Sequence, residues 1–119
     1  MEKDAKIYVA GHHGMVGSAI LRTLKAQGYT NFVLRTSKEL DLRRQADVEE
    51  FFRTEKPDYV FFAASKVGGI MANSLYPADF MYDNMIMEMN MIKNAYDNGV
   101  KKLLLIGSSG VYTRMAPQP

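Results

Sequence analysis

The sequence predicts an α/β protein built on a doubly wound parallel sheet, with helices on both faces. Short, nearly continuous apolar runs alternate with longer segments in which apolar residues recur at helical spacing. Continuous apolar runs are typical of strands buried on both faces, and strand–helix alternation is typical of parallel sheets. Because crossover connections are right-handed, we expect the N-terminal half of such a fold, with strand order 3-2-1-4.

Four strands are expected, in the apolar runs at residues 6–10, 31–34, 58–63 and 102–106. Three helices are expected between them, at residues 15–27, 43–56 and 77–98. Each helix is followed by a residue that commonly ends a helix, namely Gly28, Pro57 and Gly99. Ligands of open α/β sheets bind beyond the carboxyl ends of the strands, so we expect a site after Ala10, Leu34, Ala63 and Ile106.

Composition predicts one globular domain over residues 1–119, with 47% hydrophobic and 24% charged residues. The net charge of +2 is too small and too dispersed to indicate a nucleic-acid partner. No apolar run approaches the roughly 20 residues that a membrane-spanning helix needs. Cysteine is absent, which excludes disulfides and thiolate metal sites, and we expect the cytoplasm as the location.

A glycine-rich turn joins the first strand to the first helix. Gly11, Gly14 and Gly17 have the spacing G-x-x-G-x-x-G. Gly11 would allow the tight turn, Gly14 the approach of a pyrophosphate to the backbone, and Gly17 close packing of the helix. The helix N-terminus adds free N–H groups and the positive end of a dipole. The motif in this context predicts a Rossmann-type dinucleotide site.

The end of the second strand indicates which dinucleotide is bound. Proteins that bind NAD usually carry an acidic residue there, which accepts a hydrogen bond from the ribose 2′-hydroxyl. This chain has Arg35, followed by the hydroxyls of Thr36 and Ser37. A guanidinium suits a 2′-phosphate, so we expect NADP(H). The alternative is that Arg35 is a solvated loop residue.

His12, His13 and Asp41 have more than one interpretation. Adjacent histidines rarely bind one metal ion and no third ligand is evident, so we expect no metal site. We instead expect the two imidazoles to flank the phosphates, with His13 near the 2′-phosphate. Asp41 and Leu42 would lie along the adenine pocket, although Asp41 could instead cap the helix that begins near Arg43.

Several segments together resemble the GDP-L-fucose synthase family of extended short-chain dehydrogenase/reductases. They are Ala10–Ile20, Val33–Thr36, Ala64–Ile70 with Ala72-Asn73, Tyr76–Phe80 and Gly107–Ser109. The resemblance spans essentially the whole chain. It implies an NADPH-dependent enzyme that epimerises a 4-keto GDP-sugar at carbons 3 and 5 and then reduces the keto group.

The resemblance also implies roles for single residues. Pyrophosphate contacts fall on Gly11, Gly14, Met15, Val16 and Gly17, and 2′-phosphate contacts on His13 and Arg35. The residues that follow the third strand would border the cofactor (Ala63, Ala64, Ser65, Lys66) and begin the sugar pocket (Val67, Gly68, Gly69). Ser108 matches the family's catalytic serine, with Ser109 beside it in the substrate site; without the resemblance, this pair would be a polar turn.

Three departures qualify the resemblance. The family commonly has arginine at the position of His13, and it has its catalytic cysteine at the position of Gly110, which cannot act as the epimerisation base. No tyrosine of this chain has lysine four residues later. We therefore expect that pair and the substrate domain beyond Pro119, and a reductase without epimerase activity. The alternatives are a full epimerase–reductase and a non-catalytic nucleotide-binding module.

The long helix carries Met81, Met85, Met89 and Ile92 at helical spacing. This stripe either faces the core, where methionine fills irregular gaps, or binds a second copy of the chain. The family forms dimers through this helix, so the resemblance implies a homodimer.

Overall fold

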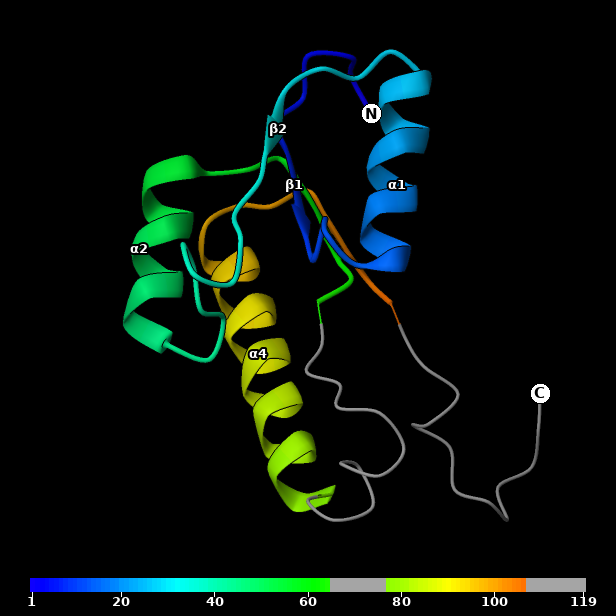
Figure 1. Cartoon of the computed structure of the whole chain (residues 1–119). Coiled ribbons are helices and arrows are strands. Elements are labelled where there is room, and N and C mark those ends of the chain that lie inside the picture. Colours follow the sequence, from blue (N-terminus) through cyan, green and yellow to red (C-terminus); the bar gives the residue numbers. More distant parts are fainter. Residues whose placement is uncertain (65–76, 107–119) are drawn as a thin grey trace, which may run out of the picture.

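A computed structural model describes residues 1–64 and 77–106 of the chain. A parallel sheet lies between helices on its two faces, with α1 on one side and α2 and α4 on the other (Figure 1). The strands are β1 (Ile7–Ala10), β2 (Phe32–Val33), β3 (Tyr59–Phe62) and β4 (Lys102–Leu105). The helices are α1 (Met15–Ala26), α2 (Gln45–Glu55) and α4 (Pro77–Asp97). The predicted α/β class is confirmed, and each element lies within the range expected for it.

The strand order is β2-β1-β3-β4 and corrects the expected order 3-2-1-4. β3 pairs with one edge of β1 over four residue pairs. β2 pairs with the other edge of β1 over only two residue pairs. β1 and β3 are the two four-residue strands without a charged residue, and this order gives each of them a neighbour on both edges. The segment between β2 and α2 forms no strand and instead buries Leu40 and Leu42 in the core.

The two faces of β1 anchor two separate apolar clusters. Side chains alternate across a strand, so Tyr8 and Ala10 pack with α2 and α4, whereas Ile7 and Val9 pack with Leu24 of α1. All four residues of β1 are buried. This rigid central strand ends at Ala10 and therefore fixes the position of the glycine turn that follows it.

Helix α4 faces the core with a different stripe from the one the sequence suggested. Met87, Met91 and Ala95 are buried against the sheet, with Asn94 beside them. Met81, Met85, Met89 and Ile92 are exposed, with 48–64% of their surface accessible. At 100° per residue, positions two apart lie about half a turn from each other, so only one of the two stripes can face the core. The core-facing interpretation of Met81–Ile92 is therefore wrong. None of the helices described is long and apolar enough to cross a bilayer.

Candidate functional site

The glycine turn brings β1, β3 and α1 into close contact. Gly11 has a φ of 85°, a conformation that side chains with a Cβ rarely adopt. Its carbonyl accepts a hydrogen bond from the N–H of Gly14 at 3.0 Å, which closes the turn. A Cβ on Gly11 would lie 2.7 Å from the backbone nitrogen of Ala64, just beyond β3. The turn therefore lies directly against the end of the neighbouring strand.

Gly17 lets the first turn of α1 pack against the glycine turn. A Cβ at this position would lie 1.9 Å from the carbonyl oxygen of Gly11. Gly14 is the N-cap of α1 and offers no side chain to the N–H groups of the first turn, which contains no acidic residue. Those groups and the positive end of the helix dipole are left for an anion.

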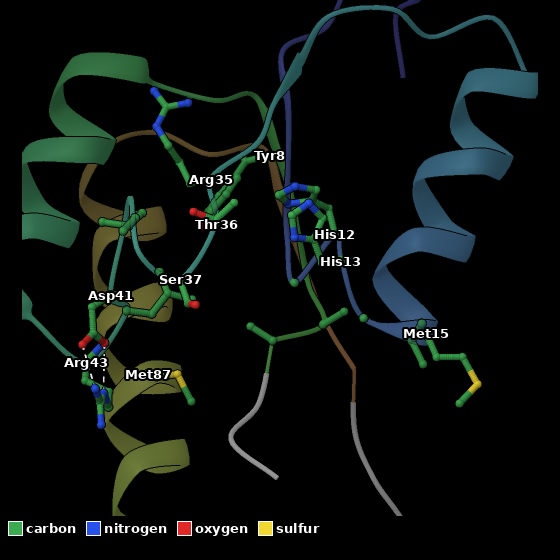
Figure 2. Close-up of a pocket in the computed structure, with 17 residues that line it drawn as sticks. Tyr8, His12, His13, Met15, Arg35, Thr36, Ser37, Asp41, Arg43 and Met87 are labelled. Atoms are coloured by element: carbon green, nitrogen blue, oxygen red, sulfur yellow. Dashed lines mark hydrogen bonds and ion pairs between the residues drawn. The ribbon is translucent and has the colours of Figure 1, made fainter. Parts of the chain in front are cut away.

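A cleft of about 910 Å³ opens where β1, β2 and β3 end, with the glycine turn on one side and α4 on the other (Figure 2). Ten of the predicted cofactor residues line it: Gly11, His13, Gly14, Met15, Val16, Arg35, Asp41, Leu42, Ala63 and Ala64. Gly17 is buried and does not line it. Ser65, Lys66, Val67, Gly68, Gly69, Ser108, Ser109 and Gly110 lie outside the described residues. The roles assigned to all these residues stay predictions.

Other residues line the cleft without having been predicted to bind the cofactor. They are Tyr8, Leu40, Arg43 and Met87. His12, Thr36 and Ser37 also line the cleft; from the sequence they were expected near the phosphates but were not counted among the cofactor residues. Tyr8 and Met87 are both buried and lie at the edge of the cleft. Burial also raises the pKa of Tyr8, so its hydroxyl stays neutral. Nothing in the sequence pointed to Arg43, whose partners are Asp41, two residues away, and Asp83 of the distant α4.

Arg35 is held by three contacts rather than solvated freely. One terminal nitrogen lies 3.3 Å from Oε2 of Glu55, and the other donates to the carbonyl of Leu34 at 3.0 Å. The guanidinium also lies over the ring of Phe51, 5.4 Å from its centroid. In Figure 2 the tip of Arg35 points away from His12 and His13.

The two histidines lie side by side at the mouth of the glycine turn. Their ring centroids are 4.1 Å apart, with the planes inclined by 56°. Nδ1 of His12 is buried and has no hydrogen-bond partner among the described residues. Burial, and secondly the neighbouring His13, hold the pKa of His12 below its ordinary value, which favours the neutral imidazole. The described residues contain no group of three or more acidic or histidine side chains that could hold a metal ion.

Asp41 closes the turn that leads into α2. Its carboxylate accepts the backbone N–H of Arg43 at 3.0 Å and the Arg43 guanidinium at 2.8 Å. The hydrogen bonds from Arg43 hold the pKa of Asp41 below its usual range. The N-cap of α2 is Arg44, so Asp41 stabilises the approach to the helix and still lines the cleft. From α4, Asn90 donates to the carbonyl of Leu42 at 2.8 Å and fixes this wall.

The comparisons with known proteins agree with this geometry. Residues 7–119 match the model of the NAD dependent epimerase/dehydratase family. The chain belongs to this family.

Among its relatives, GDP-L-fucose synthase 1 of Arabidopsis thaliana is 62% identical over 118 residues, which cover 99% of this chain and 36% of that protein. GDP-L-fucose synthase of Escherichia coli K12 is 52% identical over 114 residues, which cover 96% of this chain and 36% of that protein. The chain therefore spans about a third of the length of these family members.

Solved structures of the family share the same architecture. A protein named DdhaC superposes with a TM-score of 0.95 at 57% identity, over all of this chain and 34% of that one. MlghC, a GDP-mannoheptose C4 reductase from Campylobacter jejuni solved with NADP bound, gives a TM-score of 0.92 at 44% identity, with coverage of 100% and 35%. The described residues therefore have the same fold as the corresponding third of these solved structures.

Proposed function

We propose that this chain is the cofactor-binding part of an NADPH-dependent reductase that acts on a 4-keto GDP-sugar. The proposal rests on two features of one cleft. The first is the uncapped N-terminus of α1 at the glycine turn, and the second is Arg35, which stands where NAD-binding proteins have an acidic residue. A diphosphate suits the first feature and a 2′-phosphate the second. The relative MlghC, named a GDP-sugar reductase and solved with NADP, supports this choice of cofactor and substrate class.

The residues present fit such a cofactor. The space that a Cβ would fill at Gly11 and Gly17 is taken by backbone, so the turn is compact enough for its N–H groups to meet a pyrophosphate. Gly11, Gly14, Met15 and Val16 would hold that group, and the walls near Asp41 and Leu42 would hold adenosine. When bound, the nicotinamide supplies hydride to the keto carbon.

The chain's own contribution to the chemistry would be positioning. Ser108 would donate a hydrogen bond to the keto oxygen and hold the carbonyl for hydride attack. Val67, Gly68, Gly69 and Ser109 would contact the sugar. A Tyr-x-x-x-Lys pair, which residues 1–119 do not contain, would protonate the alkoxide as it forms.

Gly110 favours reduction without epimerisation, since glycine has no group that could remove a proton from carbon 3 or 5. A relative from C. jejuni at 43% identity is named as a GDP-6-OMe-4-keto-L-xylo-heptose reductase, which supports this choice. The second candidate is a full epimerase–reductase, favoured by the 62% identity to a GDP-L-fucose synthase.

Solvent exchange separates the two candidates. We expect the complete protein to oxidise NADPH with a 4-keto GDP-sugar that is already epimerised. Incubated in deuterated water with GDP-4-keto-6-deoxymannose and no NADPH, it should leave carbons 3 and 5 unlabelled, as measured by mass spectrometry. Labelling at either carbon would establish the epimerase–reductase instead. Absence of NADPH oxidation with both substrates would support a non-catalytic nucleotide-binding module.

The exposed stripe of α4, made of Met81, Met85, Met89 and Ile92, supports a homodimer. Four large apolar side chains in one row on a helix surface mark an interaction site more often than a solvated face.

The proposed cytoplasmic location fits the absence of cysteine.

Charge placed in this stripe should separate the two copies. The double substitution Met85→Glu and Met89→Glu is expected to convert a dimer to a monomer, because each copy would bury two unpaired carboxylates. Size-exclusion chromatography with light scattering on the complete protein measures this. Arg22→Glu, exposed on α1, is the matched control and should leave the mass unchanged. An unaltered dimer in the double variant would place the interface elsewhere.

A further inference from the structure

We propose that Glu55 is a positioning residue that competes with the 2′-phosphate of the cofactor for Arg35 and thereby limits the preference for NADPH over NADH. This inference rests on the proposed NADP(H) site and deepens it. It assigns the setting of cofactor preference to a carboxylate that does not line the cleft.

Glu55 occupies an unfavourable place for an acidic residue. It is the last residue of α2, where the negative end of the helix dipole repels a carboxylate. Two cations compensate: Nζ of Lys6 lies 3.0 Å from Oε1, and Arg35 lies 3.3 Å from Oε2. The hydrogen bond from Lys6, with the charges of Lys6 and Arg35, holds the pKa of Glu55 below its ordinary value, so the group is ionised at neutral pH. A full negative charge therefore lies against Arg35.

The position of Arg35 reflects this partner. Its guanidinium points toward the end of α2 and away from the histidines of the glycine turn (Figure 2). The carbonyl of Leu34 and the ring of Phe51 occupy another edge and one face of the same group. A phosphate must share or displace Glu55 to make a paired contact with the guanidinium, which prefers to bind one oxyanion through two parallel N–H donors.

Lys6 affects the competition between Glu55 and the phosphate because it binds the other carboxylate oxygen of Glu55. It shares Glu55 with Arg35, so its ammonium weakens the hold of the carboxylate on the guanidinium. Removal of Lys6 leaves Arg35 as the only cation within ion-pair distance of Glu55 among the described residues. Substitutions of Glu55 and Lys6 are therefore expected to change the phosphate preference in opposite directions.

Calorimetry with 2′,5′-ADP (adenosine 2′,5′-bisphosphate) and 5′-AMP isolates this effect, because the two ligands differ only in the 2′-phosphate. On the complete protein, Glu55→Gln should raise the ratio of the affinity for the first ligand to that for the second by about 1.5- to fivefold, the range that exposed ion pairs give. Lys6→Met should lower the ratio by a similar factor. Binding of 5′-AMP itself should change little in either variant.

A double-mutant cycle tests whether the effect passes through Arg35. In an Arg35→Gln background, Glu55→Gln should leave the ratio unchanged. An equal rise in that background would reveal only a general loss of negative charge and would overturn the proposal, as would an unchanged or lower ratio in Glu55→Gln alone. If Glu55→Gln fails to fold, Lys6→Met decides: a lower ratio supports the proposal and an unchanged one overturns it.

Failure of the cofactor site itself would look different. If the unsubstituted protein bound neither ligand, the dinucleotide site and the role of Glu55 would both be wrong. If it bound both ligands and the ratio did not respond to Glu55 or Lys6, the role of Glu55 alone would be wrong.

Discussion

Gly17→Ala is expected to destabilise the domain strongly and to abolish cofactor binding. The new methyl group would lie 1.9 Å from the carbonyl oxygen of Gly11. The methyl carbon is attached directly to the backbone of α1 and the oxygen belongs to the backbone of the turn, so neither can move without displacing α1 or the turn. Overpacking of this kind typically costs about 1–3 kcal/mol, and a clash with backbone belongs at the upper end. Any shift of α1 also moves the N–H groups that would bind the pyrophosphate.

Thermal unfolding and calorimetry with NADPH measure these two effects on the complete protein. Gly14→Ala is the matched control for stability, because its Cβ would lie 3.4 Å from the same oxygen and its φ of −76° suits alanine. Only the usual loss from alanine at an N-cap, about 1 kcal/mol, is expected there. Equal melting temperatures for the Gly17→Ala variant and the unsubstituted protein would show that the close packing of α1 on the turn is described wrongly.

Arg35→Gln is expected to weaken NADPH binding by about 10- to 100-fold and to leave NADH binding nearly unchanged. Hydrogen bonds to charged groups contribute about 1.5–3 kcal/mol, which corresponds to this range, and only NADPH carries the phosphate. The competition from Glu55 predicts a loss nearer the lower limit, since part of the guanidinium is already engaged.

The Arg35 substitution has a close control on the same stretch of chain. Arg44→Gln removes a guanidinium that is paired with Asp47 at 3.0 Å and does not line the cleft. Titrations of the two variants with both cofactors should therefore differ only for Arg35 and NADPH. Equal losses for NADPH and NADH in Arg35→Gln would mean that this residue supports the fold of the cleft and does not recognise the 2′-phosphate.

Most of the local structure could be predicted from the sequence because it depends on neighbours along the chain. The apolar runs at 7–10 and 59–62 are strands because both of their faces are apolar, and the helices end near Gly28, Pro57 and Gly99. The spacing of Gly11, Gly14 and Gly17 predicted a turn, and ten of the expected cofactor residues do line one cleft.

Three features depended on contacts between distant parts of the chain. The place of β3 beside β1 is decided by which pairing buries both strands, and local periodicity does not encode that choice. The face of α4 that meets the core is decided by the sheet, since Met87 and Met89 are equally apolar residues on nearly opposite sides of one helix. The partners of Arg35 include Glu55, which is 20 residues away in sequence and reaches it only because the end of α2 lies beside the segment that follows β2. The sequence by itself therefore determined the helices, the strands and the glycine turn. The tertiary structure decided the order of the strands, the buried faces of the helices and the charges around the proposed phosphate site. These features result from packing between segments that lie far apart along the chain.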